Sequence, residues 1–471
     1  MTNFYNREQE LSILTEDWET DGAKLMLLYG RRRVGKTYLL QHFFSAGHPH
    51  CYFLASTVAN QENIAQLAET LLQAIPDASG LSSSDFPTFR SVLQFYGEHS
   101  RETRFALVLD EFQYLVQRDP SIPSQLQAWW DTTGLQSQAF VVLCGSHIGI
   151  MEELAGASQP LFGRFTSRRR LTPMTCSYTA KFYEMANWSI RDKMIAYGIL
   201  GGTPRYHALF EIGRDVGWNV CKNVLSSDGL LRNEPEVLIS SSTIRDPVNY
   251  NSVLRAIALG DTRMTAIANR TGLTQSQLGF YLNNLIELEW IAREMPFGEH
   301  STKSSIYRIT DHFVHFWYRF VSRFESALEF QETSSVYHAH IEPFLNDYMG
   351  RYVFEDICLQ YLRREVLRKH GLHIKEAGRY WNRDNSVEID IVAELDDGGM
   401  LVCEAKWSST PLDIETYYSL MRKVAYLPTK GRNTITYMLF SLAGFNRDMK
   451  SRADKDGVIL VSGEELLKTS E

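Results

Sequence analysis

The clearest hydrophobic pattern in the chain is a set of three short apolar runs without polar alternation. They lie at Lys24–Tyr29, Phe105–Leu109 and Ala139–Cys144. Short continuous runs rich in leucine and valine are typical of parallel strands that are buried on both faces of a sheet. The pattern therefore predicts an α/β domain with a parallel sheet, which we place at residues 1–175.

Hydrophobic residues take up helical spacing after this region. Aromatic and aliphatic residues recur at that spacing through residues 176–238, which predicts a helical lid. In residues 239–325, a polar run at Ser240–Thr243 marks a junction, Arg263–Leu273 reads as a helix and turn, and Thr274 is placed to cap a second helix. Strand-like runs follow at Trp290–Met295 and Ser305–Ile309. The segment as a whole predicts a winged helix.

The last region, residues 335–471, returns to strand patterns. Trp381–Glu394 reads as one strand, Asp396–Gly399 as a turn, and Met400–Trp407 as the returning strand. We therefore predict a C-terminal α/β domain built around this hairpin, and a multidomain α/β chain overall.

The loop after the first apolar run carries the most specific chemistry. Residues Gly30–Thr37 have the spacing G-x-x-x-x-G-K-T, between a strand-like and a helix-like segment. The glycines permit a tight turn from which successive backbone N–H groups point at phosphates. Lys36 is expected to reach the β- and γ-phosphates of ATP, and Thr37 to hold Mg²⁺. The predicted nucleotide contacts of this loop are Gly30, Arg31, Arg32, Arg33, Val34, Gly35, Lys36, Thr37 and Tyr38.

The second and third apolar runs end in residues that would complete an ATPase site. Asp110 ends the second strand and is expected to contact Mg²⁺, while Glu111 would polarise the attacking water. Ser146 follows the third strand, where a small polar residue could sense the γ-phosphate. A strand followed by an acidic helix cap is the alternative interpretation of the acidic pair.

These motifs resemble the archaeal-type ATPases of the AAA+/STAND branch of P-loop ATPases. Two further segments carry the resemblance, Phe4–Leu11 (F-x-x-R-x-x-E-L) and Ile199–Pro204 (apolar-apolar-G-x-P). The resemblance implies that Arg7 belongs to a segment packed near the adenine, and that Pro204 lets the lid respond to the nucleotide. It also places Arg164 where an arginine finger could act in trans, in a nucleotide-dependent homo-oligomer. A solvated basic turn with Arg168–Arg170 explains Arg164 equally well.

Length and composition exclude several classes of protein. The 471 residues suggest about three domains. No apolar run reaches the roughly 18–20 residues of a membrane span, and the first residues lack the apolar core of a signal peptide, so we expect a cytoplasmic protein with no membrane partner. The six cysteines are scattered without a C-x-x-C pair, as expected for buried free thiols. A net charge of −8 argues against general coating of nucleic acid but leaves a local basic groove open.

Two roles fit the predicted winged helix. Such modules commonly place their second helix in the major groove, which would make DNA a partner. That helix offers Gln275, Ser276, Gln277 and Asn283 but neither Lys nor Arg, although groove-binding helices normally need cations for phosphates and guanine edges. We therefore favour a structural linker that transmits movement of the lid over sequence-specific DNA reading.

The C-terminal hairpin carries a second set of chemical groups. Asp390 lies on its first strand, and Glu404 and Lys406 lie on the second. Because side chains alternate along a strand, Glu404 and Lys406 should project from one face, and Cys403 and Ala405 from the other. Two carboxylates can fix a divalent cation against a scissile phosphate, while an ammonium group orients water or offsets developing charge. The set predicts metal-dependent phosphodiester hydrolysis with Mg²⁺, or with Mn²⁺.

These residues resemble the PD-(D/E)XK nuclease superfamily. Together with a STAND-type ATPase and a winged helix, they resemble one family along essentially the whole chain. The resemblance implies that Glu355, on an earlier helix, joins Asp390 and Glu404 at the metal. Glu388 departs from the usual Pro before the Asp, and it would be either an extra ligand or a solvated neighbour. A nuclease fold can also persist as a shell that only binds nucleic acid.

The combined motifs predict an ATP-hydrolysing protein that gates a Mg²⁺-dependent deoxyribonuclease in DNA processing. Defence, repair and mobile-element maintenance are equally compatible with these residues. The predicted catalytic residues are Glu111, Arg164, Asp390, Glu404 and Lys406. The alternative is a non-nucleolytic regulatory or signalling ATPase of the STAND type that binds DNA or a partner protein.

Overall fold

The chain folds into two compact units. The computed structural model describes residues 4–75, 78, 80–240, 246–299, 304–384, 386–427 and 434–469. One unit comprises Met1–Pro173 with Thr203–Arg205, and the other comprises Met174–Gly202 with Tyr206–Glu471. The predicted junction at Ser240–Thr243 lies, apart from its first residue, outside the described ranges.

The first unit is built on a five-stranded parallel sheet in the order β2-β3-β4-β1-β5. Its strands are β1 (Lys24–Tyr29), β2 (His50–Leu54), β3 (Phe105–Asp110), β4 (Ala139–Gly145) and β5 (Ser167–Arg170). The three apolar runs form β1, β3 and β4, and every residue of β3 and β4 is buried. The predicted parallel α/β sheet is therefore confirmed.

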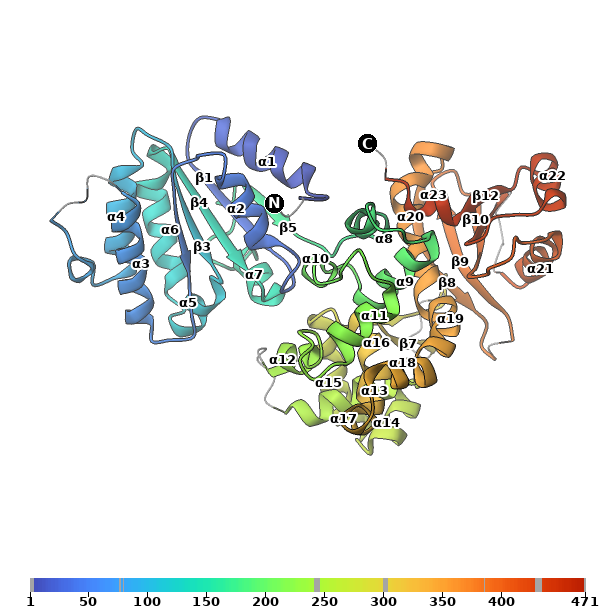
Figure 1. The fold of residues 1–471 in the computed structure, drawn as a ribbon. Coiled ribbons are helices and arrows are strands. Elements are labelled where there is room, and N and C mark those ends of the chain that lie inside the picture. The colour runs from blue at the N-terminus through green and yellow to red at the C-terminus, as the bar shows by residue number, and fades with distance from the viewer. Residues whose placement is uncertain are drawn as a thin grey trace. The chain divides into compact units, whose positions relative to one another are not determined.

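Helices cover both faces of this sheet. They are α1 (Glu8–Glu19), α2 (Lys36–Phe44), α3 (Asn60–Ala74), α4 (Phe89–His99), α5 (Gln113–Arg118), α6 (Ile122–Thr132) and α7 (Ile148–Leu154). Met26 and Leu28 of β1 belong to a buried cluster with α1 and α2, whereas Leu25 and Leu27 pack with α3, α4 and α6. Figure 1 shows α1 and α2 on one side of the sheet and α3 and α4 on the other. The alternation of β1 side chains thus makes a three-layered unit.

The second unit begins with helices in the region predicted as a lid. They are α8 (Cys176–Thr179), α9 (Ile190–Leu200), α10 (Pro204–His207), α11 (Val216–Val220) and α12 (Glu234–Ser240). Pro204 begins α10, and Thr203–Arg205 cluster with the first unit while the residues before and after them cluster with the second.

A helix–turn–helix and a strand pair follow where the sequence predicts them. The elements are α13 (Pro247–Ala258), α14 (Met264–Thr271), α15 (Gln275–Glu287), β6 (Ile291–Glu294) and β7 (Ile306–Ile309), and the two strands pair antiparallel. Gly272 ends α14 in the left-handed conformation, and the Thr274 hydroxyl accepts a hydrogen bond from the Gln277 N–H in a capping box. The predicted cap at Thr274 is therefore confirmed.

Five more helices lead to the C-terminal sheet: α16 (His312–Phe316), α17 (Glu325–Phe330), α18 (Thr333–His340), α19 (Leu345–Tyr348) and α20 (Phe354–His370). One buried cluster joins α9, α13, α16, α20 and β10 of that sheet, so the second unit has a continuous core. The aromatic residues Phe313, Phe316 and Trp317 lie inside it. Among the described helices, none is long and apolar enough to cross a membrane.

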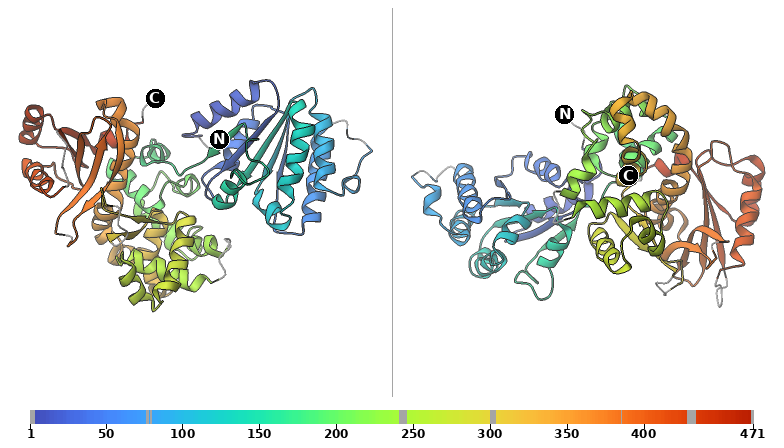
Figure 2. Two further views of the ribbon diagram at one scale, coloured as in Figure 1. Left: turned by 180° about the vertical axis from the view of Figure 1, so that it is seen from behind. Right: turned by 90° about the horizontal axis from the view of Figure 1, so that it is seen from below.

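The C-terminal sheet has five strands in the order β12-β11-β10-β9-β8, with helices around it (Figures 1 and 2). Its elements are β8 (Ile374–Trp381), β9 (Glu388–Leu395), β10 (Met400–Lys406), α21 (Ile414–Val424), β11 (Ile435–Ser441), α22 (Arg447–Asp456), β12 (Ile459–Ser462) and α23 (Gly463–Leu467). Strands β8, β9 and β10 pair antiparallel, and β10, β11 and β12 pair parallel.

The single strand predicted for Trp381–Glu394 is wrong. Trp381 ends β8, and Glu388 begins β9. Between them the Asp384 carboxylate accepts the Ser386 N–H, and the Asn382 side chain accepts the Val387 N–H. Asp and Asn side chains that bond to nearby backbone favour turns over strands, which explains the reversal.

Candidate functional site

The loop between β1 and α2 has the backbone shape of a phosphate cradle. A Cβ added to Gly30 would lie 2.2 Å from the Leu171 carbonyl oxygen, so only glycine fits there. Gly35 adopts a φ of +100° and forms the N-cap of α2. The loop therefore ends at a helix N-terminus, the position from which backbone N–H groups bind anions.

Lys36 lies buried inside this loop, with 6% of its surface exposed. Its Nζ donates hydrogen bonds to the carbonyl oxygens of Gly30 at 2.7 Å and Arg31 at 2.9 Å. Burial lowers the pKa of Lys36, while nearby Glu111 and Asp110 oppose that shift. The ammonium group is thus held at the base of the loop, within reach of a phosphate that the loop would bind.

Asp110 and Thr37 lie together at the predicted metal position. The Thr37 hydroxyl donates to Asp110 Oδ2 at 3.0 Å, and the Tyr52 hydroxyl donates to the same oxygen at 2.5 Å. Burial and the neighbouring Asp110 charge raise the pKa of Tyr52, so it stays a neutral donor. A hydroxyl and a carboxylate are hard oxygen ligands of the kind that Mg²⁺ takes beside substrate phosphates, so this donor set fits Mg²⁺.

Glu111 is held by two neutral donors. It adopts a φ of +53°, which is uncommon for a residue with a side chain. The Ser146 hydroxyl donates to Glu111 Oε2 at 2.7 Å, and Gln113 Nε2 donates both to that oxygen and to Ser146 Oγ. Gln113 is buried at 2% exposure at the start of α5. The structure thus brings Glu111 and Ser146 together, and adds Gln113, which sequence analysis missed.

Arg7, which the sequence analysis placed near the nucleotide, contacts the phosphate loop. Its guanidinium group donates to the carbonyl oxygens of Val34 at 3.1 Å and Thr172 at 2.9 Å, and it pairs with Glu10 at 3.2 Å. Burial lowers its pKa, against the charge of Glu10. The Arg7 side chain therefore contacts the backbone of the phosphate loop. Its predicted place near an adenine stays a prediction.

Arg164 contacts α6. Its Nε donates to Asp131 Oδ1 at 2.8 Å and its terminal nitrogen to Oδ2 at 2.7 Å, a bidentate pair. The carbonyl oxygens of Pro160 and Phe162 also accept from it. Its predicted role as an arginine finger stays a prediction, and it would require the Asp131 pair to break.

Asp390, Glu404 and Lys406 meet on β9 and β10 of the C-terminal sheet. Asp390 Oδ2 accepts the Ala405 N–H at 2.7 Å, and Lys406 Nζ lies 2.6 Å from Glu404 Oε1 and 3.9 Å from Asp390 Oδ2. The Lys406 side chain is 43% exposed, whereas that of Glu404 is 5% exposed. Cys403 and Ala405 belong to the core cluster that includes α20, which confirms the predicted alternation.

The charges in this group strongly influence one another. Burial, and then the charges of Glu404 and Glu355, raise the pKa of Asp390 to about 7, with Lys406 opposing them. Burial alone would lower the pKa of Lys406, but Asp390 and Glu404 outweigh it and raise that pKa. Lys423 of α21, which sequence analysis missed, places its Nζ 2.8 and 2.9 Å from the two Glu404 oxygens.

The third predicted carboxylate, Glu355 in the first turn of α20, is bound to Arg379 of β8. Burial raises the pKa of Glu355, although Arg379 opposes this. Within the described ranges, no group of three or more His, Cys, Asp or Glu side chains is arranged to hold a metal ion. The donors that fit Mg²⁺ or Mn²⁺ are therefore Asp390 and Glu404, because Mg²⁺ is commonly held by one or two carboxylates plus substrate. Glu388 is exposed at the start of β9.

The polar residues predicted for DNA contact lie on the surface of α15. Gln275, Ser276, Gln277 and Asn283 are all exposed, and so is Phe280 at 61%. The helix carries no Lys or Arg. This surface offers hydrogen bonds and apolar contact but little attraction for phosphates.

Residues 4–210 match a family of ATPase domains found predominantly in Archaea. This part of the chain is similar to the archaeal type of ATPase domain. Residues 317–417 match a family of archaeal and bacterial proteins of unknown function. The family match confirms the archaeal ATPase resemblance for this part of the chain.

Relatives extend the likeness beyond the ATPase domain. An uncharacterized protein of Methanocaldococcus jannaschii is 28% identical over 410 residues, covering 86% of this chain and 87% of the relative. An uncharacterized ATP-binding protein of the same organism is 52% identical over 40 residues, 8% of this chain and 68% of the relative. The solved structure of a Walker-type ATPase from Pyrococcus abyssi is similar in fold, with a TM-score of 0.50 and 23% identity over 67% of this chain and 96% of that chain.

Proposed function

We propose that the ATPase domain gates a metal-dependent nuclease site in the C-terminal domain, and that DNA is the substrate. The observation that carries the proposal is the meeting of Asp390, Glu404 and Lys406 on adjacent strands, in a chain that also has an ATPase domain. Support comes from the order of elements around them, a helix, three antiparallel strands, a helix and a parallel strand, which resembles the PD-(D/E)XK nuclease core.

In the ATPase domain, the glycine-shaped loop binds the phosphates and Lys36 offsets their charge. Thr37 and Asp110 would hold Mg²⁺, which neutralises charge on the transferred phosphoryl group. Glu111 orients and deprotonates the attacking water, and Ser146, bonded to Glu111, reports the γ-phosphate to it. Arg164 would complete the site of a neighbouring copy in a homo-oligomer.

In the C-terminal domain, Asp390 and Glu404 would hold Mg²⁺ or Mn²⁺, which activates water and stabilises charge on the scissile phosphate. The buried position of Glu404 excludes water from one side of that site. Lys406 is more exposed than Glu404, so its ammonium group can meet a phosphate that enters from solvent. There it would offset the negative charge that develops on that phosphate.

Gating would pass through Thr203–Arg205, where the chain crosses between the two units. Pro204 begins α10 at that point. The helices of the predicted lid share a continuous core with the nuclease-like sheet. A change of nucleotide that moves these residues would therefore act on the second unit as one body. The module of α13–α15 with β6 and β7 has the order of a winged helix and would transmit the movement of the lid, because α15 carries no Lys or Arg to attract phosphates.

The test is cleavage of plasmid and single-stranded DNA by the full chain with Mg²⁺ or Mn²⁺, with and without ATP, beside Lys406→Ala. ATP-responsive cutting that the variant loses is the expected result. Robust ATP turnover without cutting by the unaltered protein would overturn the proposal.

A specific observation favours a second candidate, a regulatory ATPase whose C-terminal domain only senses nucleic acid. Glu404 is paired with two lysines and Glu355 with an arginine, so the carboxylates are already neutralised by the chain. DNA binding by both the unaltered protein and Asp390→Asn, with no cutting by either, would support this candidate.

A further inference from the structure

Arg379 of β8 joins three carboxylates from two other elements, α20 and β6. Its Nε donates to Glu355 of α20, one terminal nitrogen lies 3.1 Å from both oxygens of Glu294 of β6, and the other donates to Asp356 Oδ1 at 2.8 Å. The Arg379 side chain is 9% exposed. Every edge of its planar fork is therefore engaged, which fixes the guanidinium group in place.

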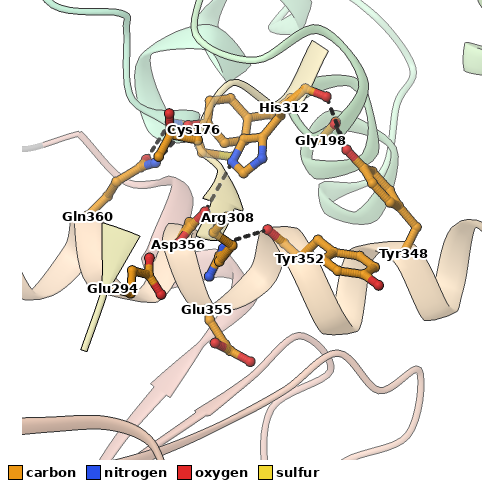
Figure 3. A network of polar contacts seen from close by, with 12 residues as sticks. Cys176, Gly198, Glu294, Arg308, His312, Tyr348, Tyr352, Glu355, Asp356 and Gln360 are labelled. Carbon is orange, nitrogen blue, oxygen red and sulfur yellow. Dashed lines mark hydrogen bonds and ion pairs between the residues drawn. The ribbon is translucent and has the colours of Figure 1, made fainter. Parts of the chain in front are cut away.

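A second arginine secures one of those carboxylates independently. Arg308 of β7 donates to Asp356 Oδ2 at 2.7 Å and to the Tyr352 carbonyl at 3.0 Å, and His312 Nε2 lies 3.7 Å from that Asp356 oxygen (Figure 3). Burial alone would raise the pKa of Asp356, but Arg308 and Arg379 hold it well below its usual range. Each oxygen of the Asp356 carboxylate is thus held by a different arginine.

Glu355 has a different environment from its neighbour Asp356. It extends from the side of α20 opposite to the His312 ring (Figure 3). Its ion pair in this network is with Arg379, and its charge acts on Asp390 and Lys406 of the candidate metal site. Glu355 is therefore paired with a guanidinium group, and it lies in the first turn of α20 next to Phe354, whose ring is 5.5 Å from the ring of Trp407 beside Lys406.

We propose that Arg379 is a positioning residue that withholds Glu355 from the metal-binding pair Asp390 and Glu404. This inference rests on the proposed nuclease site. It accounts for a third carboxylate, Glu355, that is paired with Arg379 and not grouped with Asp390 and Glu404: within the described residues, no three such side chains are arranged to hold a metal ion. It also links the site to β6 and β7, because Glu294 and Arg308 of that strand pair complete the network that orients Arg379.

The test is the affinity of the full chain for Mn²⁺, measured by titration calorimetry without DNA or nucleotide, so that no activity is needed. Arg379→Lys keeps the charge but cannot bridge three carboxylates, and should release Glu355 and tighten Mn²⁺ binding about tenfold. The double variant Arg379→Lys with Glu355→Gln should lose that gain. Arg308→Lys and Glu294→Gln are matched controls, which disturb the same network without removing the partner of Glu355 and should give no gain.

Glu355→Gln alone keeps the inference falsifiable if Arg379→Lys fails to fold. A withheld Glu355 contributes little to the metal site, so this conservative change should alter Mn²⁺ affinity less than about twofold, whereas loss of a true ligand costs about tenfold or more. A tenfold loss in Glu355→Gln, or an equal gain in Glu294→Gln, would overturn the withholding role. Asp390→Asn separates failure of the proposed metal site from failure of the role of Arg379. Unchanged Mn²⁺ binding in that variant would show that Asp390 is not part of a metal site, and this inference would fail with it.

Discussion

The ATPase site and the C-terminal site handle buried negative charge in opposite ways. In the first, hydroxyl and amide groups of Thr37, Tyr52, Ser146 and Gln113 donate to Asp110 and Glu111. The nearby cation, Lys36, bonds instead to carbonyl oxygens of its own loop. In the second, both oxygens of Glu404 contact lysine side chains.

This difference indicates how each site meets a metal ion. Neutral donors orient a carboxylate without cancelling its charge, so the ATPase site keeps its attraction for a cation. A carboxylate already paired with ammonium groups must give up those contacts to bind metal, and that exchange reduces the net gain. We therefore expect the C-terminal site to bind divalent cations more weakly and to depend more on substrate phosphate.

The largest effect should follow Lys36→Ala in the ATPase domain. Removing the buried ammonium group takes away the charge that faces the phosphates, and ATP turnover should fall by about 10³-fold or more. A turnover assay measures this, and Arg101→Ala, at an exposed cation of the same domain, is the control. If Lys36→Ala kept ATP turnover near that of Arg101→Ala, the assignment of this site would fail.

Lys406→Ala should reduce DNA cutting by about 10²-fold or more, because the exposed ammonium group is the one placed to offset charge on the phosphate. ATP turnover should stay unchanged. The matched control is Lys375→Ala, an exposed lysine of β8 that pairs with Glu394. Equal cutting by the two variants would show that Lys406 only neutralises Glu404.

Gln113→Lys makes the ATPase site resemble the C-terminal one. An ammonium group beside Glu111 would pair with the carboxylate and weaken it as a base, so kcat should fall by about 10–100-fold while nucleotide affinity is kept. Steady-state kinetics separate these terms. Gln66→Lys, on the exposed surface of α3, adds the same charge elsewhere. An unchanged kcat in Gln113→Lys would contradict both the role of Glu111 and the contrast between the sites.

The two sites also differ in how far the sequence predicted them. The phosphate loop is contiguous in the sequence. Asp110 ends a buried strand, and Glu111 and Ser146 directly follow buried strands, so local pattern and motif were sufficient. Tyr52 was missed because its contact with Asp110 depends on the pairing of β2 with β3. Gln113 was missed because its contacts depend on how α5 packs against the end of β4, next to Ser146.

At the C-terminal site, local pattern predicted the pairing of Glu404 with Lys406 but not the partners from elsewhere. Lys423 reaches Glu404 from the helix after the hairpin. Arg379 reaches Glu355 from β8, a strand that lies almost wholly before the predicted strand at Trp381–Glu394. Such ion pairs depend on tertiary packing, which hydrophobic periodicity does not encode. From sequence alone, a charged residue on a helix is interpreted as exposed to solvent, because the strand that packs against the helix is not known.

Lys423→Gln should make the smallest change and test the contrast from the other side. Its side chain is 27% exposed and pairs with both Glu404 oxygens, so replacing the cation by a neutral donor leaves a hydrogen-bonding group but restores negative charge. Because partly exposed ion pairs contribute little, Mn²⁺ binding should tighten on the order of threefold to tenfold. Titration calorimetry on the full chain measures this, with Lys455→Gln, an exposed lysine of α22, as the control. Weaker Mn²⁺ binding in Lys423→Gln would mean that Lys423 positions Glu404 for the metal instead of competing with it, and the contrast between the two sites would then lie in geometry and not in charge.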